Sequence, residues 1–347
     1  MRAIKVKNKA VLIPDSWEDL NFGEKIFTFK TLIRVLHGDL KDTPHIGLLK
    51  LLIHYTEYRP KSFRFYRLKS MVKYLWKSFL IYLINIPFLF AHGRRQYRAY
   101  TRLLRSAQRP DPNKEELERE IIDLGLLRLA ESIDFVYKID TEARKIIPLY
   151  TFRTNPFTYI RLGKSKYTGK RFFFDLTSHT DITARCFVDA LDHLLLMENV
   201  KSREHKEECI NKICAILYPA VSDHNENLLS GHARRMRDLN PVVKFGIVYW
   251  FTGIVNCFRE NDTYRVLFDR IKKAEDEGKI TIGMNEIALF LKKEGYGDPN
   301  NMNLIDYFDA QVKALKDNIS KAIAEGVKPA DISDHTGIPL DTIHRLK

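Results

Sequence analysis

Apolar residues recur every three or four positions along most of this chain, and that spacing places them on one face of an α-helix. Residues 22–36 follow the pattern, with Asp19 or Asn21 as the expected N-cap, and a strand-like run, AVLIP, precedes them at residues 10–14. A linker containing Pro44 comes next, and the apolar stretch LLKLLIHY predicts a second helix. The beginning of the chain is therefore expected to contain one strand and two helices.

The same order of elements returns in the middle of the chain. An extended run, RFFFD, precedes a cap at Asp181 or Thr183 and an amphipathic helix. A charged linker, KSREHKEE, then leads to the apolar helix ECINKICAILYP. Because residues 19–55 and 181–218 share this layout, an internal repeat is predicted. Since few residues are identical between the copies, the alternative is that two helical hairpins look alike.

Two β-hairpins are predicted before the second helical pair. FVYKID pairs with KIIPLYTF across the turn DTEAR, and YIRLG pairs with KRFFFD across GKSKYTG. Beyond Pro219 the predicted elements are helices at 225–237, 241–258, 261–274, 283–295 and 302–325, followed by two short closing helices. The predicted fold class is mainly α: multi-helical, with small β-hairpins and a C-terminal helix-turn-helix.

These patterns divide the chain into four expected segments. They are an N-terminal strand plus helical hairpin (1–58), a basic helical segment (59–134), β-hairpins plus a second helical hairpin (135–219), and a C-terminal helical domain (220–347) that ends in the helix-turn-helix (329–347). A chain of 347 residues can bury a sizeable core. Its four cysteines are too few for a disulfide framework, and the N-terminus lacks a secretory signal, so reduced thiols in a cytosolic setting are expected.

The net charge of +13 is concentrated in one block. Residues 59–109 contain thirteen Lys or Arg and no Asp or Glu, interleaved with aromatic residues. If this part is helical, five arginines fall along one stripe. The candidate anion-binding or partner-binding residues are Arg94, Arg95, Arg98, Arg102, Arg105, Arg109, Arg64, Arg67 and Lys69. Such a stripe suits a nucleic acid or an acidic protein partner, and a solvated face is the third alternative.

The last residues, 329–347, have the pattern of a helix-turn-helix. Pro329 suits the first position of a helix, and Thr336-Gly337-Ile338 suits the turn. A DNA reader would present Thr342, His344 and Arg345 to a groove. Phosphate-binding cations are scarce around them, however. The pattern therefore predicts the shape, and favours packing or docking over DNA reading.

No catalytic or metal site is predicted. The GKS at residues 163–165 lacks the upstream glycine and the following helix that a phosphate loop needs. HARR, at residues 232–235, matches the H-x-x-R box of tyrosine recombinases, but the other boxes are missing. A metal site from His205, Cys209, Cys214, His224 and His232 lacks the tight ligand pairs of structural zinc.

Two apolar stretches raise the question of a membrane. Residues 78–91 are uncharged, but a spanning helix needs roughly 20 apolar residues, and Pro87 interrupts this one. Residues 241–258 are longer but contain Lys244 and two glycines. Both stretches are predicted to be buried helices, with a membrane-interface segment or a span as the alternatives for 78–91, and a membrane partner is not expected.

IPDSWEDLNFGEKIF, at residues 13–27, resembles the opening of helical proteins encoded in tail-assembly regions of phages and prophages of Bacteroidetes-type bacteria. FDLTSHTDITARCFVDA (174–190) and CAILYP (214–219) are similar to later segments of such proteins, although the arginine expected in the second is absent. The resemblance implies a non-enzymatic virion or assembly role. Protein partners come foremost, and no catalytic residues are carried over.

This resemblance and the lack of a catalytic constellation predict a non-enzymatic phage or mobile-element protein. It would bind phage structural or assembly proteins during particle (tail) assembly, in the host-cell cytoplasm or in the virion. The alternative is a DNA-binding protein that uses the basic stripe 59–109 and the C-terminal helix-turn-helix. No cofactor is expected, and the oligomeric state is left open.

Overall fold

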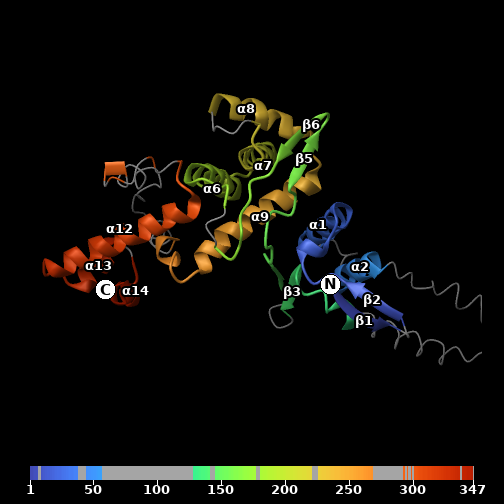
Figure 1. The fold of residues 1–347 in the computed structure, drawn as a ribbon, viewed down its shortest axis with the longest axis horizontal. Helices are drawn as coiled ribbons and strands as arrows, with labels where there is room; N and C mark the ends of the chain where they lie inside the picture. Colours follow the sequence, from blue (N-terminus) through green and yellow to red (C-terminus); the bar gives the residue numbers. More distant parts are fainter. Residues whose placement is uncertain are drawn as a thin grey trace, which may run out of the picture. The chain divides into compact units, whose positions relative to one another are not determined.

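The computed structural model describes residues 1–6, 9–37, 44–56, 128–140, 145–176, 180–220, 226–268, 301–336 and 338–346, with residues 292, 293, 295 and 298 (Figure 1). The chain forms two compact units. Unit 1 comprises Met1, Pro14–His37 and Phe135–Lys347, and unit 2 comprises Arg2–Ile13 and Gly38–Asp134. Helices dominate the described residues, and the strands there form three two-stranded antiparallel hairpins. The predicted fold class, mainly α with small β-hairpins, is confirmed.

Unit 2 combines a β-hairpin with helix α2 (Pro44–Thr56). Strands β1 (Arg2–Val6) and β2 (Lys9–Ile13) pair antiparallel, and α2 packs against β2 with Leu48, Leu51 and Leu52 buried. The sequence pattern indicated β2 and α2 but missed β1. Pro44 was expected in the linker, yet it begins the helix. Proline is tolerated there because the N–H of the first helical residue has no partner within the helix, so its absence costs nothing. The basic block 59–109, with all nine of its candidate residues, lies outside the described residues.

Helix α9 (Pro241–Glu260) runs through the middle of unit 1 and packs against α1 (Phe22–Leu36). As predicted, α1 begins at the Asn21 cap, whose side chain accepts from the Glu24 amide at 3.0 Å while Glu24 caps the Asn21 amide in return. An aromatic cluster fills the interface. Within it, the Trp17 ring lies 4.6 Å from Phe29 and 4.9 Å from Phe152.

A second helical layer contains α6 (Ala184–Asn199) and α7 (Arg203–Leu217), which pack closely as a hairpin. Thr183 caps α6, as one of the two expected residues. The linker predicted over KSREHKEE is wrong, since those residues are helical from Arg203 onward. Of the two predicted repeat copies, only this one lies within a single unit; α1 and α2 belong to different units.

The hairpins also differ in part from the expected ones. Strands β3 (Tyr137–Asp140) and β4 (Lys145–Pro148) pair as predicted. The second pairing is wrong: β5 (Tyr159–Leu162) pairs with β6 (Ser165–Thr168), which was expected to be turn. Gly163 adopts φ +58°, which lets a turn of only two residues join the strands. The predicted strand 170–175 instead bonds elsewhere, for example from the Lys170 amide to the Leu217 carbonyl at 2.8 Å.

The helices after Pro219 largely follow the prediction. Helix α8 (Glu226–Arg235) passes into a short 3₁₀ turn, η2 (Met236–Asp238), before α9. Helix α12 (Leu304–Ala324) follows further on. Of the predicted helix 261–274, residues 265–268 are helical and those after 268 lie outside the description; most of 283–295 lies outside it too.

Helix α9 contains the longer of the two apolar stretches. Among the described helices it is the one whose length and composition would let it cross a bilayer, and 67% of its most apolar 18-residue stretch is buried inside the protein. Trp250, Phe251 and Phe258 are fully buried. The helix is therefore packed as a core helix is. The other stretch weighed for a membrane, 78–91, lies outside the described residues.

Candidate functional site

The C-terminal residues form the predicted pair of short helices. Helix α13 (Pro329–Thr336) begins at Pro329, and α14 (Leu340–Leu346) follows after a short turn. Ile332, Ile338 and Ile343 are buried, because their spacing directs them into the space between the helices. The Ser333 hydroxyl donates to the Ile338 carbonyl oxygen at 2.7 Å and ties α13 to the turn. The helix-turn-helix shape is thus present, and α12 packs against both of its helices.

The predicted DNA-contacting residues lie on α14 but lack a cationic setting. Thr342 is half-buried and His344 is exposed, whereas the side chain of Arg345 lies outside the description. Residues 304–346 contain five Lys or Arg against seven Asp or Glu. An acidic excess repels a phosphate backbone. This part of the chain therefore does not have the charge of a DNA-reading surface.

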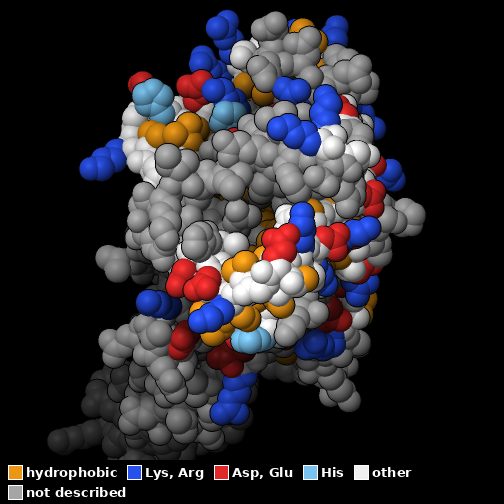
Figure 2. Space-filling view, turned by 90° about the vertical axis from the view of Figure 1, so that its left-hand side faces the viewer, with side chains coloured by type: hydrophobic (Ala, Val, Ile, Leu, Met, Phe, Trp, Pro, Cys, Tyr) orange, Lys and Arg blue, Asp and Glu red, His pale blue; other side chains and the backbone are white. Residues whose placement is uncertain are grey.

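The same helices expose apolar side chains. Val327, between α12 and α13, is 39% exposed, and Leu340, at the start of α14, is 43% exposed. Exposed Lys328, Asp331 and Asp341 lie close to them in sequence. Figure 2, which looks onto the side that carries α12–α14, shows acidic and basic side chains interspersed with apolar ones. We call these five residues the C-terminal surface.

The remaining predicted site residues do not come together. His232 is buried, and its Nε2 donates to the Tyr218 carbonyl oxygen at 2.7 Å, whereas Arg235 is exposed. They do not form the phosphate grip that the H-x-x-R pattern suggested. Gly163 and Lys164 form a hairpin turn that is followed by strand β6, whereas a phosphate loop is followed by a helix. Within the part of the chain described, no three His, Cys, Asp or Glu side chains are placed to hold a metal ion.

The structure reveals a cationic surface that the sequence patterns did not single out. Arg161 on β5 pairs with Lys166 on β6, and both are exposed, as are Tyr159 and the turn residue Lys164. We call these four residues the cationic hairpin. Ile160 and Tyr167 point to the opposite face and are buried. A charge count would have found it, since residues 143–174 contain eight Lys or Arg and no Asp or Glu.

A buried polar network fixes the base of this hairpin. The Asn155 side chain donates from Nδ2 to the Lys170 carbonyl oxygen at 3.0 Å and accepts from the Phe157 amide at 2.9 Å. The Tyr218 hydroxyl donates to the Phe157 carbonyl oxygen at 2.6 Å and lies 2.9 Å from Asn155 Oδ1. Burial raises the pKa of Tyr218 well above its usual value, so the phenol keeps its proton. Gly169 leaves the room that these side chains occupy.

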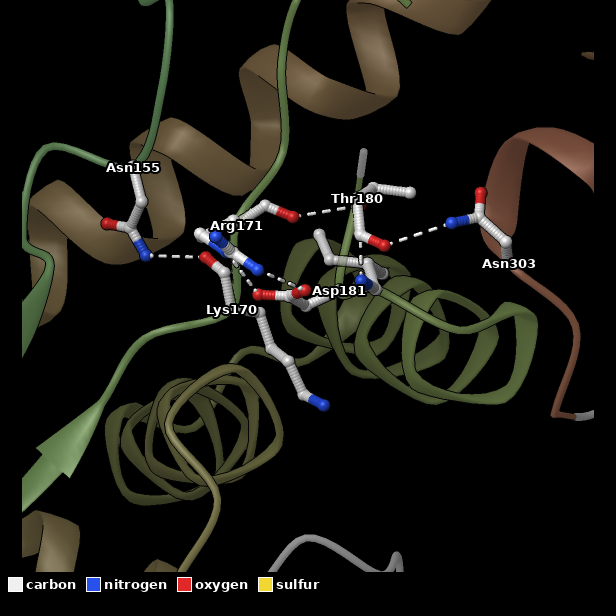
Figure 3. A network of polar contacts seen from close by, with 7 residues as sticks. Asn155, Lys170, Arg171, Thr180, Asp181 and Asn303 are labelled. Carbon is white, nitrogen blue, oxygen red and sulfur yellow. Dashed lines mark hydrogen bonds and ion pairs between the residues drawn. The ribbon is translucent and has the colours of Figure 1, made fainter. Parts of the chain in front are cut away.

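The network continues from the hairpin base toward the C-terminal helices (Figure 3). The Thr180 hydroxyl donates to the Arg171 carbonyl oxygen at 2.8 Å, and Asn303 Nδ2 donates to the Thr180 carbonyl oxygen at 2.9 Å. Arg171 and Asp181 form a two-pronged ion pair at 2.7 and 3.0 Å. The Arg171 guanidinium lowers the pKa of Asp181. One run of bonds thus links the segment that follows β6, the residues just before α6 and the N-cap of α12.

Comparisons with known proteins do not add a family. The chain matches no protein-family model, and neither the curated proteins nor the solved structures searched include a significant match. The described residues of unit 1 present two surfaces, the C-terminal surface and the cationic hairpin.

Proposed function

We propose that this protein is a non-enzymatic binding protein of a phage or mobile element, and that it acts by docking protein partners during tail assembly. The observation that carries the proposal is the C-terminal surface. Exposed Val327 and Leu340 lie there among charges of both signs. Protein interfaces commonly combine an apolar centre with a charged rim. The protein would work in the host-cell cytoplasm or in the assembled particle.

The helix pair provides a firm base for such docking. Ile338 and Ile343 are fully buried, and α12 supports both short helices. The end of α12 is marked by Gly326, which adopts φ +85° and so turns the chain toward α13. Leu340 is therefore held on a fixed helix start, and a partner would lose little conformational freedom on binding it.

The resemblance to tail-assembly-region proteins adds a second line of support, at the level of the fold. Two of the residues that carry it are buried: Trp17 belongs to the aromatic cluster beside α1, and Tyr218 belongs to the polar network. Buried positions of this kind support a resemblance in the core. The partner-binding role is inferred from the surface.

The experiment is affinity capture from a lysate of the producing host, with captured proteins identified by mass spectrometry. The full chain is expected to retain a virion structural or assembly protein, and Leu340→Asp is expected to lose it. Leu196→Asp is the matched control, because Leu196 is 50% exposed on α6, away from the C-terminal surface in sequence. Capture without any such protein, or equal loss with both variants, would contradict the proposal.

The second candidate, a DNA-binding protein that uses the stripe 59–109 and the helix pair, stays a prediction. The acidic excess over residues 304–346 argues against the helix pair as its DNA-contacting part. Anisotropy titration with duplex DNA in 50 mM salt tests it. A steep loss of binding on raising the salt would support this candidate, and no binding would dispose of it.

A further inference from the structure

We propose that the cationic hairpin binds single-stranded nucleic acid, with its cations on the phosphates and Tyr159 stacked on a base. This surface is separate from the C-terminal surface and does not depend on the proposed function. Neighbouring positions on one face of a two-stranded ribbon lie close enough to act together. Arg161 and Lys166 are direct cross-strand partners, and Lys164 follows at the turn.

The three cations are available to a ligand. Arg161, Lys164 and Lys166 are exposed, and no ion pair joins them to another residue that the structure describes. Arg171 differs, since Asp181 already neutralises it at 2.7 Å. Cations that are not neutralised by the protein attract phosphates and release their counterions on binding.

Tyr159 adds a stacking platform to this charge. The residue is 41% exposed, and Lys166 Nζ lies 4.3 Å and Arg161 Cζ 5.7 Å from the centre of its ring. Proteins that bind single strands combine a cationic track for the backbone with aromatic rings for the bases. A second exposed ring, Phe22 at the start of α1, lies 5.6 Å from the buried Phe157 ring, and Phe157 precedes Tyr159 by two positions in the chain.

The hairpin is held rigidly from behind. On its buried face Tyr167 packs 4.7 Å from His232 of α8, so this helix lies against the ribbon. Arg234 and Arg235 are exposed on the same helix and extend the positive field. Asn155 and Tyr218 fix the base of the hairpin through buried hydrogen bonds. A preformed surface binds with a smaller loss of conformational entropy.

A nucleic acid fits this surface better than an acidic protein does. An acidic peptide would use the charges but would have no specific use for a ring flanked by two cations. A single strand uses both, because its unpaired bases can leave the backbone and stack. A duplex keeps its bases stacked internally and cannot offer them to Tyr159.

The first test measures the binding of a fluorescein-labelled 20-mer of thymidine to the full chain between 50 and 200 mM salt. Arg161→Gln/Lys164→Gln/Lys166→Gln is expected to weaken binding and to reduce the slope of log affinity against log salt by about 2, since each phosphate contact on a single strand contributes about 0.7. Lys313→Gln/Lys316→Gln/Lys321→Gln removes the same charge from the exposed side of α12 and is expected to leave the slope unchanged. Equal changes in both variants would overturn the proposal.

The second test isolates the ring. Tyr159→Leu is expected to weaken binding of the thymidine oligomer about five-fold or more, whereas Tyr159→Phe retains it. With an abasic oligomer of equal length, Tyr159→Leu is expected to bind like the unaltered chain. An unchanged affinity of Tyr159→Leu for thymidine would overturn the proposal. Poly-glutamate that binds as tightly as the oligomer, and is weakened equally by the hairpin variants, would also overturn it. That result would assign the surface to an acidic protein.

Leu340→Asp separates this inference from the proposed function. It is expected to abolish partner capture while leaving oligonucleotide affinity unchanged. Conversely, the hairpin variants are expected to keep capturing the partner. The thermal unfolding of each variant is compared with that of the unaltered chain. An unchanged unfolding temperature shows that a change in binding reflects the altered surface and not misfolding.

Discussion

The hydroxyl of Tyr218 donates a 2.6 Å hydrogen bond to the carbonyl oxygen of Phe157, 61 residues earlier in the chain. This bond joins the C-terminal end of α7 to the segment that enters β5. Both residues are buried, so neither group can turn to water instead. The relationship fixes where the cationic hairpin begins relative to the helical layer.

Tyr218→Phe is expected to lower the free energy of unfolding by about 1–3 kcal/mol, because it leaves the buried Phe157 carbonyl without this donor. Urea unfolding followed by circular dichroism measures it. Tyr150→Phe is the control, since Tyr150 is only half-buried, and a change within about 0.5 kcal/mol is expected there. A Tyr218→Phe protein as stable as the unaltered chain would show that the bond contributes nothing net.

Two glycines are expected to respond to alanine in opposite directions. A Cβ at Gly169 would lie 2.5 Å from Asn155 Nδ2 and 2.7 Å from Tyr218 Cε1, so Gly169→Ala is expected to cost about 1–3 kcal/mol. A Cβ at Gly231, on α8, would meet no atom within 4 Å, and Gly231→Ala is expected to stabilise by about 0.5–1 kcal/mol. Thermal unfolding of the two variants checks the signs. The same sign for both would contradict the packing at Gly169.

His232 is expected to make stability depend on pH. Burial lowers its pKa in the folded protein, so the unfolded chain takes up a proton first as the pH falls. The contribution of neutral His232 to the free energy of unfolding is fully present above the ordinary histidine pKa of about 6.5. It declines as the pH drops through that value toward the pKa of His232 in the folded protein. The free energy of unfolding, measured by urea titration from pH 8 to pH 5, should therefore decrease.

His232→Gln keeps a donor for the Tyr218 carbonyl but cannot be protonated, so it should flatten this decline. It should not remove the decline entirely, because burial also lowers the pKa of His193. Exposed His205, changed to Gln, serves as the control. A slope that His232→Gln leaves intact would show that the buried imidazole does not contribute.

The cysteines are expected to be poorly reactive in the native protein. Cys214 is fully buried, and burial raises the pKa of its thiol to about 12, while the pKa of half-buried Cys257 is raised to about 11. At pH 8 few thiolates are present to react. Iodoacetamide labelling followed by mass spectrometry should modify Cys214 only as fast as the protein opens. Rapid labelling of Cys214 without denaturant would contradict its burial.

The sequence alone determined the elements whose signals are local. Residues 22–36 and 184–199 carry an apolar face and a capping residue, and both cues act within one or two turns of helix. The closing helix pair was equally legible, because Pro329 and the spacing of Ile332, Ile338 and Ile343 specify a short packed unit. The prediction that this pair favours packing or docking over DNA reading also rested on local charge, since phosphate-binding cations are scarce around it.

Only the tertiary structure decided the hairpin and its surface. By pattern, FFF at residues 172–174 looked more like a strand than SKYT at 165–168, because apolar content favours buried strands. The real pairing depends on long-range bonds: Asn155 to Lys170 and Tyr218 to Phe157 hold the hairpin base, and Leu217 receives the backbone that follows. The longest of these bonds joins residues 61 positions apart, so no short stretch of sequence contains both partners. The same bonds place Tyr159 and its cations on one exposed face, and that placement supports the nucleic-acid site proposed above.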